Sequence, residues 1–272
     1  MSFRGRVWQG ILLSSALGLF AVGSVFAEEM PAKADAQAQT TAPASATKAA
    51  DDDWHVNTNV YLWFTGMHGT VGAGGFETSV HASASEVFSK FNIGFMDTTE
   101  FQKKRFVIPL DIMWAKLSDD KAIPFLPNYA VKAKLNQTIF TPKVGYVLVD
   151  HPKLNVQGNV GIRYWHQGTT LELDPQIAGH SLYSALNWVD VVAGGRITVP
   201  LSPKAYVTIL GDAGAGGANL DYQVAGLLSY KFKPKWQVFG GWRYLDVDYQ
   251  SGGSVNDIVQ SGVLVGVTYI FK

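Results

Sequence analysis

From Trp54 to the C-terminus, large apolar residues alternate with small or polar residues in many separate segments. In the segment 154–164, every second residue from Leu154 onward is mostly large and apolar, while the positions between hold asparagine, glutamine, glycine and Arg163. The segments 188–199, 205–213, 222–232 and 236–244 repeat this pattern. A period of two residues over such lengths predicts β-strands rather than helices.

The predicted strands are long, and their polar faces carry little charge. Many exceed the roughly five or six residues of an ordinary strand, and lengths of about ten or more suit strands that cross a bilayer at a tilt. Glycine, asparagine, glutamine and single charges on the polar face are typical of a crowded barrel interior. The sequence therefore predicts an all-β fold, an up-and-down antiparallel transmembrane β-barrel.

The alternation predicts about ten strands, within a range of about 8 to 12. They lie near residues 54–65, 94–103, 105–117, 130–149, 154–172, 183–201, 204–214, 220–233, 236–250 and 257–271. Residues 66–93 fit this pattern less well, and 78–84 is a candidate for a further strand. Ser83 and Glu86 form a capping-box pattern, which predicts a short helix in the first extracellular loop.

The predicted connections alternate in length, which sets an orientation. Short turns are expected at 103–105, 151–153, 202–204 and 233–235, and longer loops at 118–129, 172–181, 214–219 and 251–256. Outer-membrane barrels place their short turns in the periplasm and carry an aromatic belt at each interface. The expected loop-side belt is Trp63, Trp114, Tyr164, Trp165, Trp188, Trp242 and Tyr244. The expected turn-side belt is Tyr146, Tyr206, Tyr230, Trp236, Tyr269 and Phe271.

Composition narrows the alternatives. The formal net charge is zero and no basic run is present, so no nucleic-acid partner is expected. Cysteine is absent, which excludes disulfides and thiolate metal sites. A soluble lipocalin-like barrel would expose its polar face to water, and the 16% of charged residues is low for such a surface.

The N-terminal part predicts export. Residues 1–27 combine Arg4 and Arg6, a short apolar stretch and a small residue at Ala27, a pattern typical of a cleaved signal peptide. Residues 28–53 are rich in alanine, threonine and acid and predict a flexible periplasmic leader. Residues 54–272 are then the barrel, and the predicted location is the outer membrane of a Gram-negative bacterium.

The last residues, GVTYIFK, resemble the signal read by the outer-membrane assembly machinery, with Gly266 followed by Tyr269 and Phe271. Lys272 after the final aromatic and Val265 before the glycine depart from that pattern. Residues 54–272 also resemble a family of Gram-negative outer-membrane β-barrel proteins, through the segments 61–75, 161–165, 187–196 and 241–249. The resemblance implies the assembly machinery, outer-membrane lipid and lipopolysaccharide as partners, and implies no substrate.

The inward faces of the predicted strands carry a set of ionisable residues. They are Glu100, Asp111, Arg163, Asp190, Arg196, Asp212, Lys231 and Arg243. One interpretation is a pathway of low conductance for small polar solutes. The other is a structural network of ion pairs, which we favour because balanced charge neither selects ions nor keeps a pore open.

Two further functional classes are weaker alternatives. A lipid-modifying enzyme would use a His and Ser pair such as those near His166 or His180, but no catalytic motif surrounds either, so no enzymatic activity is expected. His68 and His81 lack a third ligand at metal-binding spacing, so neither a metal nor another cofactor is expected. Surface recognition through an apolar loop patch at 125–129 is the remaining alternative.

Overall fold

The computed structural model describes residues 53–73, 75–122, 130–174 and 181–271. The expected signal peptide and all of the expected leader except Asp53 lie outside the described residues. No helix in the described ranges is long and apolar enough to cross a membrane.

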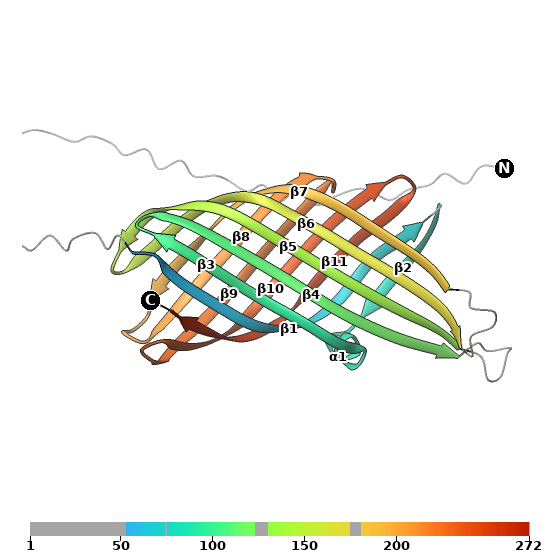
Figure 1. Cartoon of the computed structure of the whole chain (residues 1–272), viewed down its shortest axis with the longest axis horizontal. Helices are drawn as coiled ribbons and strands as arrows, with labels where there is room; N and C mark the ends of the chain where they lie inside the picture. The colour runs from blue at the N-terminus through green and yellow to red at the C-terminus, as the bar shows by residue number, and fades with distance from the viewer. Residues whose placement is uncertain (1–52, 74, 123–129, 175–180, 272) are drawn as a thin grey trace, which may run out of the picture. The chain divides into compact units, whose positions relative to one another are not determined.

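Ten antiparallel strands form a closed barrel, and an eleventh strand extends one part of its wall (Figure 1). The strands are β1 (His55–Ala73), β2 (Phe76–Ala82), β3 (Phe91–Lys103), β4 (Phe106–Ala122), β5 (Ala130–His151), β6 (Leu154–Asp174), β7 (Ser181–Pro200), β8 (Ala205–Gly216), β9 (Leu220–Lys233), β10 (Trp236–Ser251) and β11 (Ser254–Ile270). From β3 to β11 each strand pairs with its neighbour in sequence, and β11 pairs with β1 from Asn57–Ile270 to Gly72–Val255. The predicted up-and-down barrel of about ten strands is confirmed.

The alternating pattern assigns the two faces of the wall as predicted. Val191 and Val265 lie on the exterior, 60% and 43% exposed, whereas Asp190 and Arg163 are fully buried inside. Large apolar side chains are exposed on every strand of the wall. Such a continuous apolar exterior is far larger than the apolar patches of soluble monomers and is typical of a barrel surrounded by lipid.

One end of the barrel holds four short connections, at residues 104–105, 152–153, 201–204 and 234–235, and is called the turn end below; the opposite end is the loop end. Two of the longer loops predicted at the loop end are wrong. β8 continues to Gly216 and β9 begins at Leu220, while β10 and β11 are joined by Gly252 and Gly253 alone. Both glycines have positive φ, 59° and 78°, as a two-residue hairpin turn requires.

The predicted aromatic belts are partly wrong for one physical reason. Trp63, Trp165 and Trp188 stand at the height of the loop-side belt, but their position in the alternation turns them into the barrel, where each is at most 6% exposed. Tyr206 likewise points inward at the turn end. The aromatic residues that do remain on the exterior include Tyr164 and Trp242 toward the loop end and Tyr146, Tyr230, Trp236 and Phe271 toward the turn end.

The wall between β1 and β3 is only partly paired. The β1–β3 ladder runs from His55–Gln102 to Val60–Asp97 and ends there, and β2 pairs with β1 only from Met67 onward. Residues 61–66 of β1 therefore form no ladder with residues 91–96 of β3. These two facing stretches are called the seam. On the turn-end side of the seam, the Asp97 carboxylate faces outward and accepts hydrogen bonds from Thr58 and Thr99, at 2.8 and 2.7 Å.

The short helix α1 (Ala84–Ser89) lies beside the seam (Figure 1). The predicted capping box is present: the Ser83 hydroxyl accepts from the Glu86 amide, and the Glu86 carboxylate accepts from the Ser83 amide at 2.6 Å. The Ser83 hydroxyl also donates to the Glu86 carboxylate at 2.7 Å, and this hydrogen bond, followed by the one from the Ser83 amide, lowers the pKa of Glu86 below its ordinary value. The carboxylate half of the cap is therefore complete at neutral pH and is lost as pH falls through that lowered pKa. The Phe88 ring contacts Phe64 and Phe91 at centroid distances of 5.2 and 6.5 Å, which covers the seam with aromatic surface.

Hydrogen exchange followed by mass spectrometry on the folded barrel tests the seam. We expect peptides covering 91–96 to exchange at least about tenfold faster than peptides covering 154–164, because alternate amides of β3 lack a ladder partner there. Phe88→Ala should accelerate exchange at 61–66 and 91–96 further, since it removes the ring that bridges Phe64 and Phe91. Phe76→Ala, which truncates an exposed ring on β2, is the matched control. Equal protection at the two sites would contradict the seam.

Candidate functional site: the charged lumen

The interior of the barrel has two unlike parts. Toward the loop end, buried apolar and aromatic side chains fill the lumen and form the loop-end core: Tyr61, Trp63, Met96, Met113, Ile139, Trp165, Trp188, Ala218, Leu245, Val247, Tyr249 and Leu264. Trp188 stacks between Trp165 and Tyr249, at centroid distances of 5.3 and 4.3 Å. Toward the turn end lies a cavity of about 320 Å³, called the turn-end chamber.

Arg163 forms the most deeply buried ionic group, on β6 between the core and the chamber. Its guanidinium donates to Asp212 at 2.5 Å and also to Asp221, and its Nε donates to Thr141 at 3.2 Å. The second oxygen of Asp221 accepts from the Trp165 indole at 2.8 Å, which ties the ionic group to the aromatic stack.

Asp212 also binds groups that reach it from the chamber side. Its Oδ2 accepts from Lys143 at 2.6 Å and from the Gln223 amide at 2.8 Å. Two cations, Arg163 and Lys143, thus face two carboxylates, Asp212 and Asp221, with every side chain at most 11% exposed. The group is electrically neutral, which offsets the cost of removing four charges from water.

Glycines on neighbouring strands make room for this group. A Cβ on Gly161 would lie 2.7 Å from the Lys143 Cγ, and a Cβ on Gly194 would lie 2.5 Å from the Asp212 Cβ. Both positions also bring that Cβ within 2.2 Å of a backbone oxygen, so only glycine fits there. Gly161 and Gly194 therefore leave room for the large inward side chains of the neighbouring strands.

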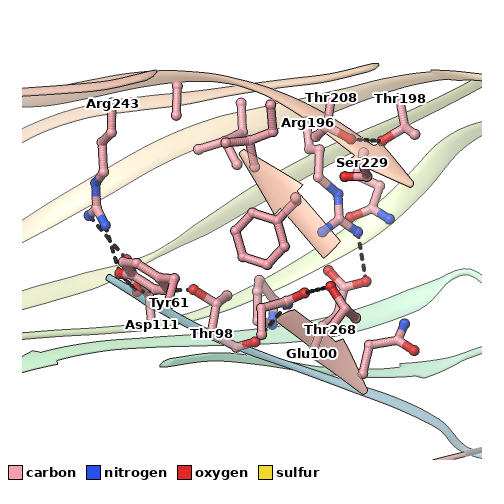
Figure 2. Close-up of a pocket in the computed structure, with 18 of the residues that line it drawn as sticks. Tyr61, Thr98, Glu100, Asp111, Arg196, Thr198, Thr208, Ser229, Arg243 and Thr268 are labelled. Carbon is pink, nitrogen blue, oxygen red and sulfur yellow. Dashed lines mark hydrogen bonds and ion pairs between the residues drawn. The ribbon is translucent and has the colours of Figure 1, made fainter. Parts of the chain in front are cut away.

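A second group joins β1, β4 and β10 across the lumen (Figure 2). Arg243 donates to the Tyr61 hydroxyl at 2.8 Å and to Asp111 at 3.2 Å, and Tyr61 donates to Asp111 at 2.9 Å. Thr98 on β3 adds a third hydrogen bond to Asp111, at 3.1 Å. The Arg243 guanidinium also lies 5.0 Å from the centre of the Trp63 ring, a cation–π distance.

A third pair stands in the chamber itself. Arg196 on β7 donates to Glu100 on β3 at 2.6 Å, across the width of the lumen (Figure 2). The Arg196 side chain is 28% exposed, so this pair is wetter than the other two groups.

Asp190 and Lys231 behave differently from the other six predicted residues. Asp190 is fully buried in the loop-end core, where it accepts from the Trp188 indole at 3.0 Å and from the Ala218 amide at 2.7 Å rather than from a cation. Lys231 stands opposite Gln237 near the turn end and contributes no ion pair to the groups described above. Asp190 is therefore part of the core and does not line the chamber.

Sequence reasoning missed Lys143 and Asp221. Both occupy inward positions of the alternation: Lys143 follows Ile139 and Thr141 on β5, and Asp221 precedes Gln223 on β9. Extending the period of two through Pro142, and back to the first turn of β9, would have found them.

Three side chains that line the chamber each have one buried polar atom without a hydrogen-bond partner: the Asn159 Oδ1, the Gln223 Oε1 and the Arg243 Nε. The Gln223 amide orientation is fixed because its Nε2 donates to Asp212. These atoms have almost no surface accessible from the chamber, so they are exceptions to the usual pairing of buried polar atoms rather than contacts for a solute.

The residues considered for catalysis or metal binding gather into no such site. In the described part of the chain, no three His, Asp or Glu side chains lie close enough to hold a metal ion. His166 is on the exterior, 2.7 Å from Asn187, and His68 and His81 are exposed cross-strand neighbours on β1 and β2. His180 and the patch at 125–129 lie outside the described residues.

The three residues of the expected assembly signal have distinct structural roles. Gly266 faces inward, where a Cβ would lie 2.5 Å from the Phe239 ring. Tyr269 packs between Trp236 and Phe271 near the turn end, at centroid distances of 4.8 Å to each. The assembly role itself stays a prediction.

Neither a protein-family model nor a curated protein sequence matches the chain. Solved structures with a similar fold include the attachment invasion locus protein Ail of Yersinia pestis (TM-score 0.38, 10% identity, 80% of this chain and 98% of that chain). The toluene transporter TbuX of Ralstonia pickettii (0.37, 10%, 80% and 88%) and CarO2 of Acinetobacter baumannii (0.32, 10%, 80% and 98%) are also similar. These neighbours are Gram-negative outer-membrane β-barrel proteins. At these TM-scores they carry no argument about what this chain does.

Replacing Arg163 should cost more stability than replacing Arg196. Arg163→Met leaves two carboxylates buried with one remaining cation, so we expect a loss of about 3 to 5 kcal/mol in the free energy of unfolding. Arg196→Met removes one partly hydrated partner and leaves the single buried carboxylate of Glu100 beside the chamber, so it should cost about 1 to 3 kcal/mol. Urea unfolding in lipid vesicles, followed by tryptophan fluorescence, measures both. Equal losses would show that burial does not separate the two groups.

Proposed function

We propose that the chain is an integral outer-membrane barrel of a Gram-negative bacterium whose lumen is closed to the passage of hydrated solutes. Its role is structural, with conductance that is low or absent. The observation that carries this proposal is the loop-end core, in which stacked aromatic rings occupy the lumen where a channel would run.

The exterior supports the location. Exposed apolar side chains cover the wall, and aromatic residues cluster near both of its ends. A transmembrane β-barrel requires such an apolar band with aromatic girdles, and lipid is then the partner of the whole outer surface. The pairing of β1 with β11 closes the ring and leaves no open edge at that junction, as hydrocarbon surroundings demand.

The space left inside the loop-end core supports closure. A cavity of about 10 Å³ lies in this core between Trp165, Leu245 and Ile258. That volume is at the lower limit for one water molecule, so no hydrated ion fits. The turn-end chamber therefore ends blindly against the core.

The charges of the lumen also favour a structural role, because they are paired with one another. Arg163, Arg243 and Arg196 each face a carboxylate on a strand that is not their neighbour in the sheet, and Arg196 and Arg243 reach theirs across the lumen. A selective pore exposes an excess of one charge to the permeating ion. Paired charges instead hold the walls at a fixed distance from one another.

Single-channel recording in planar bilayers tests closure directly. We expect the refolded barrel, residues 28–272, to be silent. The double substitution Trp165→Ala and Trp188→Ala should produce steady conductance, because it removes the two stacked indoles that fill the lumen.

Trp242→Ala is the matched control, since this indole is 54% exposed on the exterior and should leave the recording silent. Folding of each variant is checked by the shift in electrophoretic mobility on heating. Steady conductance of the unchanged barrel would overturn the proposal, and so would silence of a correctly folded double variant.

A further inference from the structure

We propose that the turn-end chamber is a binding site for a small, neutral, polyhydroxylated solute about the size of one sugar ring, which enters from the turn end. The inference rests on the proposed function only for the side from which the solute arrives, the periplasm. The site itself follows from the volume, the charge balance and the polar and apolar lining of the chamber.

The chamber is a built cavity rather than a gap between strands. Its volume of about 320 Å³ lies at the lower end of the range of about 300 to 1,000 Å³ typical of small-molecule sites. Residues of the turn end such as Asn57, Tyr206 and Gln237 line it at one side, and the Arg243 group closes it at the other. A solute thus has one way in and no way through.

The charge of the lining argues for a neutral ligand. Three acidic and three basic side chains line the chamber: Glu100, Asp111, Asp212, Lys143, Arg196 and Arg243. All six form ion pairs within the lumen, at distances from 2.5 to 3.2 Å. A charged ligand would have to break one of these pairs and leave its partner unpaired at low dielectric, which is costly.

The uncharged polar side chains of the lining argue for hydroxyl groups. Amides such as those of Asn57, Gln157 and Gln237 both donate and accept hydrogen bonds. A hydroxyl does the same, so a molecule with several hydroxyls matches such a lining. Thr198, Thr208 and Ser229 add further hydroxyls to the same lining (Figure 2).

Apolar side chains complete the match to a sugar ring. Leu210, Leu227 and Phe239 line the chamber among its polar groups. A pyranose presents C–H groups on its faces and hydroxyls around its edge, so it fits a cavity that mixes apolar surface with a few fixed polar atoms. A simple inorganic ion offers no such apolar face.

Binding is tested with D-glucose as the probe, on the full mature barrel refolded in detergent micelles. We expect saturable binding by saturation-transfer NMR and by equilibrium dialysis with labelled sugar. Glycine and acetate, the zwitterionic and anionic probes, should bind at least about tenfold more weakly. Each would have to bind a charged side chain that already forms an ion pair within the lumen. Absence of saturable glucose binding, or tighter binding of either charged probe, would overturn the proposal.

Two substitutions locate the binding in the chamber. Asn159→Leu removes one polar amide of the lining and fills part of the cavity, and should weaken glucose binding about tenfold. Leu227→Phe reduces the volume without touching a polar group and should have the same direction of effect, so the test survives if one variant fails to fold. Gln260→Ala is the matched control: Gln260 is 4% exposed, as Gln223 is, and has an unpaired Oε1, but lies outside the chamber. Equal binding by all folded variants would place the sugar elsewhere.

The outcome is separable from that of the conductance recording. Glucose binding by a silent barrel supports both proposals. Glucose binding by a conducting barrel removes closure and keeps the site, and a silent barrel without saturable binding removes the site and keeps closure.

Discussion

The pairing of the last strand with the first is the constraint on which the rest of this structure depends. Hydrocarbon offers no partner to a backbone amide, so a sheet that crosses it must return to its own first edge. β11 meets β1 along sixteen residues of β1, 57–72, and the ring closes at ten strands. The number of strands sets the internal diameter of the barrel. About eight strands leave an interior that side chains fill, and each added strand widens it. Ten strands therefore leave more space than ordinary side chains occupy, and the molecule fills one half with tryptophans and leaves a chamber in the other.

The buried ion pairs stand where these two halves meet. Arg163 touches the core through the Asp221 carboxylate that Trp165 also binds, and touches the chamber through Asp212. Replacing such groups with apolar residues is often neutral or favourable for stability, so their presence calls for another reason. Their geometry supplies one. Arg196 and Arg243 meet carboxylates on strands across the lumen, and Arg163 meets carboxylates two and three strands away, so these pairs fix how strands that share no ladder face one another. The same pairing leaves the chamber without net charge, and so determines the class of molecule it accepts.

Much of the fold follows from the alternation of residue types, and much of the site does not. The sequence predicts the strands, both faces of the wall and the capping box at Ser83, because each depends on local spacing. Position in the alternation also decides which charges turn inward, but Lys143 and Asp221 are missed unless the pattern is extended through Pro142 and back to the start of β9. The prediction fails for Trp165 and Trp188. Their distance along the strand suggests an exterior aromatic belt, but their position in the alternation places them inside the barrel. The sequence also fails to show that Arg196 meets Glu100 rather than Asp190, or that Asp190 stands among tryptophans. Those contacts depend on the register between neighbouring strands all around the barrel, and the pattern within one strand does not determine that register.

The seam between β1 and β3 shows how side chains can replace a missing ladder. The last backbone pair between these strands is Val60 with Asp97, and Tyr61 is the next residue of β1. Its hydroxyl reaches across the lumen to Asp111 on β4 and Arg243 on β10, while Thr98, next to Asp97 on β3, binds the same carboxylate. Both edges of the seam are thus tied to one buried group at the point where their mutual hydrogen bonds end. The exterior side is covered by Phe88 of α1, so lipid meets aromatic surface rather than unpaired backbone. The charge group of β1, β4 and β10 therefore closes the chamber and at the same time fixes the weakest part of the wall that contains it.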